Sequence, residues 1–224
     1  MLKILVVEDE TAIRRFIKIN LERQGFEVLD VESGEEGLDA FADLNPDIAL
    51  LDVMLPGISG LEVAKRIREL DNNVGIIMLT AKSQDVDKIL GLESGADDYM
   101  TKPFNPTELI LRIKSLARRV EIKDVPDTLE DDVFKLDQNT RQFFKNGIYV
   151  ELTPTEFAIM DLFMRNPHKA FSRDELLDLI WGRDFVGDSK IIDVNIRRIR
   201  SKIEDDASEP QYINTVWGLG YRYR

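Results

Sequence analysis

The sequence contains no cysteine and only one histidine among its 224 residues. The absence of cysteine excludes disulfides, thiolate metal sites and cysteine nucleophiles, and it fits a reducing compartment. Positive charge is scarce as well, because 30 Lys and Arg stand against 42 Asp and Glu, for a formal net charge of −12. Non-specific affinity for nucleic acid or membranes is therefore not expected, and any DNA contact must come from a local basic patch.

Long apolar runs are also missing. No stretch is long enough to cross a bilayer, and the chain starts with a strand-like run, residues 3–7, without a signal-peptide pattern. We therefore expect a cytoplasmic protein with no membrane partner. The glycine patterns of P-loop and Rossmann proteins are absent, and the lone His168 follows Pro167 in an expected loop, which disfavours a catalytic or phosphate-carrying role.

One apolar run, Ile48 to Asp52, is followed by a Pro56-Gly57 turn. Because it lacks polar alternation, the run predicts a strand that is buried on both faces, as in a parallel sheet covered by helices. Asp52 is then expected at the carboxyl end of a strand, where open α/β sheets bind their ligands. Taken alone, the same residue fits a turn cap equally well.

Similar strand-like runs recur through residues 1–119, and each is followed by helical periodicity. The runs cover residues 3–7, 26–31, 47–52, 75–80 and 97–101. Three helix starts have the spacing of a capping residue and a glutamate, namely Ser33 with Glu36, Ser59 with Glu62, and Asn105 with Glu108. This alternation predicts a doubly wound α/β domain with a five-stranded parallel sheet.

Polar residues gather at one rim of that sheet: Glu8 and Asp9 after the first strand, Asp52 after the third, Thr80 after the fourth, and Tyr99 and Lys102 at the fifth. Converging carboxylates repel by about 4 kcal/mol per pair at about 4 Å unless a cation or proton compensates. Oxygen ligands without His or Cys suit Mg²⁺, which accepts a phosphate oxygen as a further ligand. The arrangement predicts a phosphoryl-acceptor site with Asp52 as nucleophile.

Four segments together resemble the flavodoxin-like receiver domain of two-component response regulators. They are Val6 to Glu10, Leu51 to Gly57, Leu79 to Ala81, and Gly95 to Phe104. The resemblance implies phosphoryl transfer from a sensor histidine kinase to Asp52, the only chemistry expected of a protein that is otherwise not an enzyme. It implies Mg²⁺ (or Mn²⁺) held by Asp9, Asp52, the Met54 backbone carbonyl and, through water, Glu8. It also implies that Thr80 and Tyr99 form a switch pair, with Lys102 on the phosphoryl group.

The last α-β-α face of the domain resembles the phosphorylation-induced homodimer interface of the OmpR/PhoB subfamily. The expected interface residues are Lys88, Leu92, Asp97, Asp98, Glu108, Arg112, Ile113 and Arg119. Leu92 and Ile113 would form the apolar centre of this face, and the charged residues would pair across a two-fold axis. A solvated charged helix surface is the alternative, since surface ion pairs contribute little individually.

Residues 120–129 show neither helical nor strand periodicity and contain Pro126, so they are expected to form a linker. Grouped elements follow in residues 130–224, which favours a separate α+β domain. Short strands are expected at 133–136, 142–145 and 148–152, with a hairpin turn at Asn146-Gly147. Helices are expected to begin at Thr153 and Ser172, each with a glutamate three residues later, and at Ser189.

The third of these helices is basic against an acidic background. Isoleucines at 192, 196, 199 and 203 form an apolar stripe, while Lys190, Arg197, Arg198, Arg200 and Lys202 lie around the other side. A basic helix after a helix and turn suits the major groove of double-stranded DNA, because arginine binds guanine edges and phosphates. Read alone, the helix also fits a solvated amphipathic face.

The segment Tyr212 to Tyr223 predicts two short strands around a glycine-containing turn, a wing beside the basic helix. With the preceding helices it resembles the winged helix-turn-helix domain of OmpR/PhoB-type regulators. The resemblance implies DNA contacts from Arg198 and Arg200, with Arg197 and Lys202 as weaker candidates, and, in the adjacent groove, from Thr215 with the wing. It further implies binding to direct-repeat or paired half-sites, and a loop at 181–189 that meets RNA polymerase. Trp217 stands where many relatives carry a basic residue, and packing is its simplest expected role.

Other proteins with an Asp nucleophile or this fold fit less well. A haloacid-dehalogenase-type phosphatase needs a second Asp where Met54 stands, and in a flavodoxin-like FMN carrier Glu8, Asp9 and Glu10 would repel phosphate. The sequence thus predicts a DNA-binding transcriptional regulator that is activated by phosphorylation of Asp52. A regulator of the same fold that dimerises without phosphorylation remains the alternative.

Overall fold

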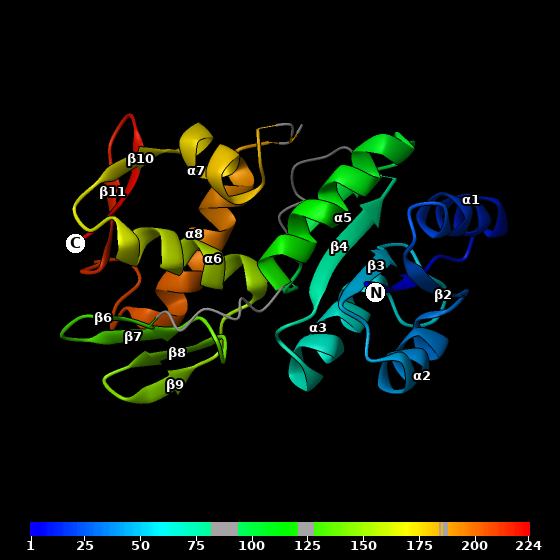
Figure 1. Ribbon diagram of the computed structural model, residues 1–224, viewed down its shortest axis with the longest axis horizontal. Helices are drawn as coiled ribbons and strands as arrows, with labels where there is room; N and C mark the ends of the chain where they lie inside the picture. The colour runs from blue at the N-terminus through cyan, green and yellow to red at the C-terminus, as the bar shows by residue number, and fades with distance from the viewer. Residues whose placement is uncertain (82–93, 121–127, 184, 186–187) are drawn as a thin grey trace. The chain divides into compact units, whose positions relative to one another are not determined.

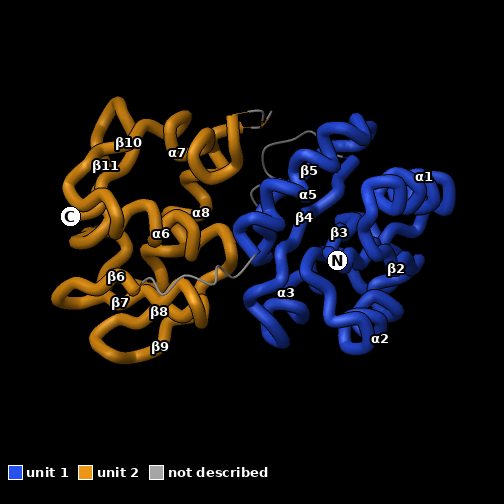
Figure 2. The backbone as a smooth tube through the Cα atoms, in the orientation of Figure 1, with its two compact units in different colours: residues 1–120 blue, residues 121–224 orange. Residues whose placement is uncertain are grey.

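The computed structural model describes residues 1–81, 94–120, 128–183, 185 and 188–224. The chain divides into two compact units, residues 1–120 and 121–224 (Figure 2). None of the helices in the described ranges combines the length and the apolar character needed to cross a bilayer.

The first unit is a five-stranded parallel sheet with helices on both faces (Figure 1). Its strands are β1 (Lys3–Val7), β2 (Glu27–Val31), β3 (Ile48–Asp52), β4 (Gly75–Thr80) and β5 (Asp98–Thr101). The described helices are α1 (Thr11–Glu22), α2 (Gly34–Leu44), α3 (Gly60–Leu70) and α5 (Pro106–Val120). The strand order β2-β1-β3-β4-β5 reverses at β1, which confirms the predicted doubly wound fold. Residues 82–93, between β4 and β5, lie outside the described residues.

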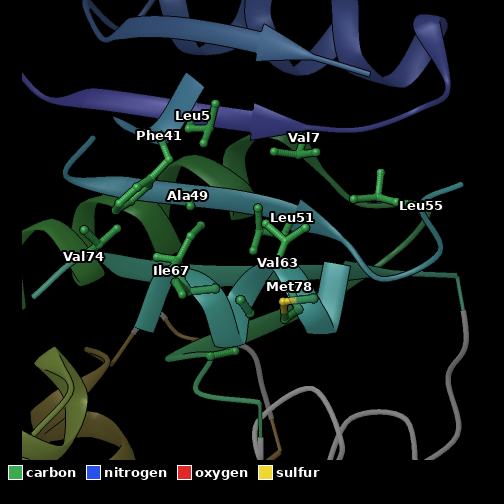
Figure 3. Close-up of a cluster of buried hydrophobic side chains, with 13 residues drawn as sticks. Leu5, Val7, Phe41, Ala49, Leu51, Leu55, Val63, Ile67, Val74 and Met78 are labelled. Atoms are coloured by element: carbon green, nitrogen blue, oxygen red, sulfur yellow. The ribbon is translucent and has the colours of Figure 1, made fainter. Parts of the chain in front are cut away.

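Two hydrophobic clusters cover the faces of this sheet. Ala49 and Leu51 of β3 belong to the cluster that includes residues of α2 and α3 (Figure 3), whereas Ile48 and Leu50 belong to the cluster that includes residues of α1 and α5. Successive side chains of a strand point to opposite faces, so a strand covered on both sides must be apolar at every position. The uninterrupted apolar run therefore marks the centre of the fold.

Three helix starts of the first unit, those of α2, α3 and α5, follow the predicted caps. The hydroxyls of Ser33 and Ser59 accept hydrogen bonds from the backbone N–H of Glu36 and Glu62, at 3.3 Å in both cases. At α5 the side-chain oxygen of Asn105 accepts from the N–H of Thr107 at 2.8 Å. These bonds satisfy N–H groups that have no partner within the helix.

The second unit places three helices between two antiparallel sheets. The first sheet contains β6 (Thr128–Glu130), β7 (Phe134–Asp137), β8 (Gln142–Lys145) and β9 (Ile148–Val150). The helices are α6 (Pro154–Arg165), α7 (Arg173–Ile180) and α8 (Lys190–Ile203). The second sheet has the order β10-β12-β11, with β10 (Ala170–Ser172), β11 (Ile213–Val216) and β12 (Gly220–Tyr223).

The helices and the wing of the second unit match the sequence prediction, and three details differ. Strand β6 begins at Thr128, inside the segment expected to be a linker, and β10 was not expected. The side chain of Ser189 makes no capping hydrogen bond at α8, contrary to the prediction. Asp188 takes that place, because its carboxylate accepts from the N–H of Lys190 at 3.0 Å.

Candidate functional site

Three carboxylates converge at the carboxyl ends of the central strands of the first unit. Glu8 and Asp9 follow β1, and Asp52 is the last residue of β3. One oxygen from each lies within 4.8 Å of the others. Glu8 and Asp52 are buried, whereas Asp9 is exposed. The parallel sheet thus brings together carboxylates that lie more than forty residues apart in the sequence.

The ammonium group of Lys102 joins two of these carboxylates. Its Nζ lies 2.6 Å from Oε2 of Glu8 and 2.8 Å from Oδ2 of Asp52. Burial raises the pKa of Glu8, and Lys102 only partly opposes this. Burial by itself would lower the pKa of Lys102, but its hydrogen bonds to Asp52 and Glu8 raise it overall. Lys102 is therefore held as a cation inside the acidic cluster.

The turn after Asp52 is fixed by close backbone contacts. The Oδ1 atom of Asp52 accepts from the N–H of Met54 at 3.2 Å, and the N–H of Val53 donates to the carbonyl of Leu79 at 2.9 Å. A Cβ atom at Gly60, in the first turn of α3, would lie 1.9 Å from the backbone oxygen of Asp52. Only glycine fits there. The sequence analysis did not identify Gly60, although its place after the cap residue Ser59 was visible.

Thr80 and Tyr99, the expected switch pair, lie on neighbouring strands. Thr80 is the buried last residue of β4 and pairs with Thr101 of β5, and its carbonyl accepts from the N–H of Lys102 at 2.7 Å. Tyr99 is half-buried and packs against the cluster that includes residues of α2 and α3. The structure thus places Thr80 at the same rim as the acidic cluster, and the movement of the pair stays a prediction.

The donor set fits a hard divalent cation. Three carboxylates and one ammonium group leave an excess of negative charge in a partly buried site, and oxygen atoms are the ligands that Mg²⁺ and Mn²⁺ prefer. Asp9 faces solvent, which leaves the cluster open on one side.

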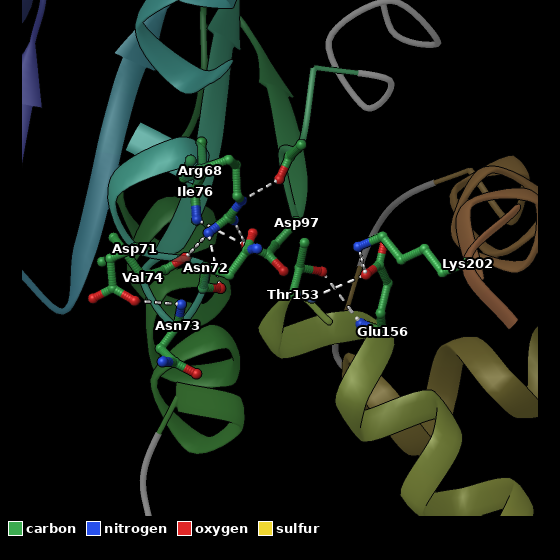
Figure 4. A network of polar contacts seen from close by, with 11 residues as sticks. Arg68, Asp71, Asn72, Asn73, Val74, Ile76, Asp97, Thr153, Glu156 and Lys202 are labelled. Atoms are coloured by element: carbon green, nitrogen blue, oxygen red, sulfur yellow. Dashed lines mark hydrogen bonds and ion pairs between the residues drawn. The ribbon is translucent and has the colours of Figure 1, made fainter. Parts of the chain in front are cut away.

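Two residues expected at the dimer face have structural roles instead. Asp97 is fully buried, and its carboxylate accepts from Arg68 Nη2 at 2.6 Å and from the N–H of Ile76 at 2.9 Å (Figure 4). Ile113 belongs to the core between the sheet and α5, so the prediction that it forms the apolar centre of an interface is wrong. Sequence analysis missed Arg68, whose guanidinium also donates to the carbonyls of Gly95 and Val74.

Other residues of that face form ion pairs within the chain. Arg112 Nη1 lies 2.9 Å from the carboxylate of Asp98, and Arg112 Nη2 lies 2.7 Å from that of Glu108. Burial lowers the pKa of Arg119 to about 10. Lys88 and Leu92 lie outside the described residues.

The cations of α8 differ in their surroundings. Lys190 and Arg197 are exposed and Arg198 is half-buried. Arg200 donates to the carbonyl of Ile213 at 2.6 Å and to the hydroxyl of Thr215 at 3.0 Å. Lys202 lies 2.7 Å from the buried carboxylate of Glu156 (Figure 4). Arg200, Thr215 and Lys202, expected to contact DNA, therefore hold the domain together.

The wing is attached to α8 by further residues that the sequence analysis missed. Asp193 of α8 accepts from the hydroxyl of Tyr221 and from Nε of Arg173, at 2.7 Å in both cases. Glu204, which follows α8, accepts from the N–H groups of Tyr212 and Ile213 at 2.9 Å. The sequence offered one sign of these roles: Asp193 is a carboxylate within an otherwise basic helix, and Glu204 is a carboxylate directly after it.

The two tryptophans have opposite environments. Trp181 is buried and lies next to Phe185, with ring centroids 5.9 Å apart. Trp217, in the turn of the wing, is 91% exposed, so the expectation that it packs is wrong. Residues 184, 186 and 187 of the expected polymerase loop lie outside the described residues.

An acidic cluster at the strand ends of a doubly wound sheet, followed by a winged-helix unit, defines a regulator with one sensing and one DNA-binding domain. The family model for the response regulator receiver domain matches residues 4–114, and that for the C-terminal domain of transcriptional regulatory proteins matches 147–223. The chain therefore belongs to the OmpR/PhoB-type two-component response regulators, a family of transcriptional regulators rather than enzymes.

Individual relatives extend over the whole chain. The transcriptional regulatory protein AfsQ1 of Streptomyces coelicolor is 43% identical over 222 residues, which are 99% of this chain and 98% of AfsQ1. The alkaline phosphatase synthesis regulator PhoP of Bacillus subtilis is 42% identical, with 98% and 95% covered. The crystal structure of DrrB, an OmpR/PhoB homologue from Thermotoga maritima, is 35% identical with a TM-score of 0.54 and covers 100% of this chain and 99% of its own.

Proposed function

We propose that Asp52 accepts a phosphoryl group from the phosphohistidine of a sensor histidine kinase. The observation that carries this proposal is the convergence of Glu8, Asp9 and Asp52 within 4.8 Å, with Lys102 bonded to two of them. A carboxylate at a strand end, beside a fixed cation and a hydroxyl, has the groups that phosphoryl transfer requires.

In the transfer, an oxygen of Asp52 attacks the phosphorus atom and forms a new P–O bond. The P–N bond to the kinase imidazole breaks, and the imidazole nitrogen keeps the electron pair and takes up a proton. Lys102 and the Thr80 hydroxyl then bind phosphoryl oxygens. Mg²⁺ or Mn²⁺, held by Asp9, Asp52, the Met54 carbonyl and, through water, Glu8, would neutralise the negative charge of the phosphoryl group.

The output of the switch is DNA binding by two copies of the chain. The exposed Lys190 and Arg197 and the half-buried Arg198 of α8 are the residues that we propose to enter the major groove. Arg200 and Thr215 position the wing beside them. Dimerisation through β5 and α5 would exchange the ion pairs of Asp98, Glu108 and Arg112 across a two-fold axis, with Arg119 on the same face. We further propose that the loop at 181–189 meets RNA polymerase.

Intact mass spectrometry tests the chemistry. The native chain and Asp52→Ala are incubated with Mg²⁺ and a small-molecule phosphodonor, with and without a chelator. We expect one phosphoryl adduct on the native chain in Mg²⁺ only. The absence of an adduct under conditions where Mg²⁺ binds would contradict aspartyl phosphorylation and favour a regulator that dimerises without it.

Sedimentation of the same samples tests the dimer. Phosphorylation is expected to convert monomers to dimers in the native chain and to fail to do so in Arg119→Ala. The matched control is Arg66→Ala, because Arg66 pairs with Glu62 on the surface of its own helix. Dimers of phosphorylated Arg119→Ala at the native concentration would exclude Arg119 from the interface.

A further inference from the structure

Helix α1 starts differently from α2 and α3, whose first turns are capped by serines. Within the described residues, the side chain of Glu10 at the start of α1 makes no capping hydrogen bond. Arg14, one turn into the helix, reaches back instead, and its Nη1 atom donates to the backbone carbonyls of Glu8 and Asp9 at 2.7 Å and 3.2 Å. The guanidinium thus binds the backbone of two residues whose carboxylates belong to the acidic cluster.

The same guanidinium is held from its other side by two carboxylates. Nε of Arg14 lies 3.5 Å from Oδ2 of Asp30 in β2, and Nη2 lies 3.2 Å from Oε2 of Glu32, directly after that strand. The side chain of Arg14 is only 12% exposed. Because a guanidinium is planar and presents its donors in a rigid fork, partners on both sides fix its orientation. Arg14 therefore connects the backbone of the acidic cluster to β2.

We propose that Arg14 is a positioning residue that fixes the backbone of Glu8 and Asp9, so that their carboxylates bind a divalent cation together with Asp52. This rests on the proposed phosphoryl-acceptor site and deepens it. The N–H of Glu8 donates to the carbonyl of Val31 at 3.2 Å, so the sheet holds this residue from one side and Arg14 from the other. Because a peptide group is planar, fixing the direction of a carbonyl fixes the peptide group that follows the residue.

Arg14 acts through geometry rather than through its charge. Its positive charge is already paired with Asp30 and Glu32, whereas Lys102 bonds directly to carboxylates of the cluster. Groups that orient metal ligands without touching the ion change metal affinity by about 10- to 100-fold when they are removed. We expect Arg14→Met to weaken Mn²⁺ binding about tenfold. Arg14→Lys keeps the charge without the fork and should recover little of this loss.

The first measurement is the binding of Mn²⁺ alone to the unphosphorylated full chain, followed by electron paramagnetic resonance of the free ion. Binding that is lost in Asp52→Ala defines the site. The titrations are repeated at about 50 and 500 mM salt, because screening weakens the effect of a charge but not that of bond geometry. The tenfold difference between the native chain and Arg14→Met should therefore be the same at both salt concentrations.

The second measurement is the rate of adduct formation at Asp52 from a small-molecule phosphodonor as a function of Mn²⁺ concentration. Arg14→Met should need about tenfold more Mn²⁺ for half its maximal rate and should approach the native rate at saturation. A general loss of structure would instead lower the rate at every Mn²⁺ concentration.

Lys18→Met is the matched control. Lys18 lies one turn after Arg14 on α1 and binds the same Asp30 carboxylate at 2.6 Å, but in the described ranges it makes no bond to Glu8 or Asp9. This variant should lose an ion pair to Asp30 and keep the native affinity for Mn²⁺. Circular dichroism in urea without metal reports whether each variant is folded.

Three results would overturn the proposal. They are native Mn²⁺ affinity in folded Arg14→Met, native affinity in Arg14→Lys, or an equal loss in Lys18→Met. The second result would assign the effect to charge alone, and the third to the ion pairs of Asp30. If Arg14→Met does not fold, Arg14→Lys decides the question. Failure of the proposed function itself looks different, because the native chain would then bind Mn²⁺ no more tightly than Asp52→Ala and would form no adduct.

Discussion

Each unit of the chain contains a lysine bonded to a fully buried glutamate, and the two pairs have nearly the same geometry. Lys102 Nζ lies 2.6 Å from Glu8, and Lys202 Nζ lies 2.7 Å from Glu156. Both glutamates have no exposed surface. A buried lysine–glutamate pair is therefore not evidence of a functional site by itself.

The surroundings of the two pairs separate them. Glu8 has Asp9 and Asp52 within 4.8 Å, so a single ammonium group leaves excess negative charge. Glu156 instead closes the capping box of α6, since its carboxylate also accepts from the N–H of Thr153 at 2.9 Å. Surplus carboxylates at strand ends indicate a site for a cation and a phosphoryl group, whereas a closed pair at a helix start stabilises the fold.

Lys202→Met should therefore cost stability and leave phosphorylation intact. It leaves the buried Glu156 carboxylate without its cation, and we expect the free energy of unfolding of the second unit to fall by about 3 kcal/mol. Urea unfolding followed by tryptophan fluorescence measures this, because both tryptophans lie in that unit. The double variant with Glu156→Leu should regain most of the loss. A loss below about 1 kcal/mol would show that Glu156 does not depend on Lys202.

Lys102→Met should show the opposite pattern. Losing a fixed cation beside the phosphoryl group should slow adduct formation at Asp52 about 100-fold. The urea midpoint of the first unit in Mg²⁺ should change little, because a divalent ion can balance Glu8 and Asp52. Intact mass against time gives the rate, and circular dichroism gives the midpoint. An unchanged rate of adduct formation would show that Lys102, like Lys202, only stabilises the fold.

The parts of the fold that were predicted correctly are those determined by residues close to one another in the sequence. The apolar run at β3 requires helices on both sides, and the spacing of Thr153 and Glu156 requires a helix start. The gathering of Asp52 and Lys102 at one rim follows from these, because parallel strands must end on the same side of a sheet.

The errors in predicting the dimer face and the DNA contacts concern which side of a helix or strand is buried within its own unit. Asp97 is buried because Arg68, 29 residues earlier, reaches it, and no local pattern reports such a pair. Arg112 and Ile113 are adjacent in the sequence, but one residue turns the helix by about 100°, so one pairs with Asp98 and the other lies in the core. The basic composition of α8 likewise could not show that Arg200 binds the wing through the carbonyl of Ile213 rather than facing solvent.

The close approach of Gly60 to Asp52 gives a smaller effect that links stability to the site. In Gly60→Ala the new Cβ would meet the Asp52 carbonyl, so the turn must shift, and we expect a loss of about 2 kcal/mol with slower phosphorylation. Gly25→Ala is the control, because Gly25 has a φ of 82° and its new methyl group would meet no described atom within 4 Å. It should cost about 1 kcal/mol of backbone strain and leave the phosphorylation rate unchanged. Equal rates in the two variants would separate Gly60 from the site.

Alkaline pH should produce the smallest effect, which the tryptophans report for the second unit. Burial and the hydrogen bond to Asp193 raise the pKa of Tyr221 from 10.0 to about 12. A phenol whose pKa is raised by folding stabilises fully below pH 10, and this stabilisation is lost as the pH rises from 10 to 12. The urea midpoint reported by tryptophan fluorescence should therefore fall over that window, and less so in Tyr221→Phe. Burial also raises the pKa of Tyr223 beside Asp131, so the variant keeps part of the fall. An identical fall in both proteins would assign the effect to Tyr223 and leave the attachment of the wing to α8 independent of pH.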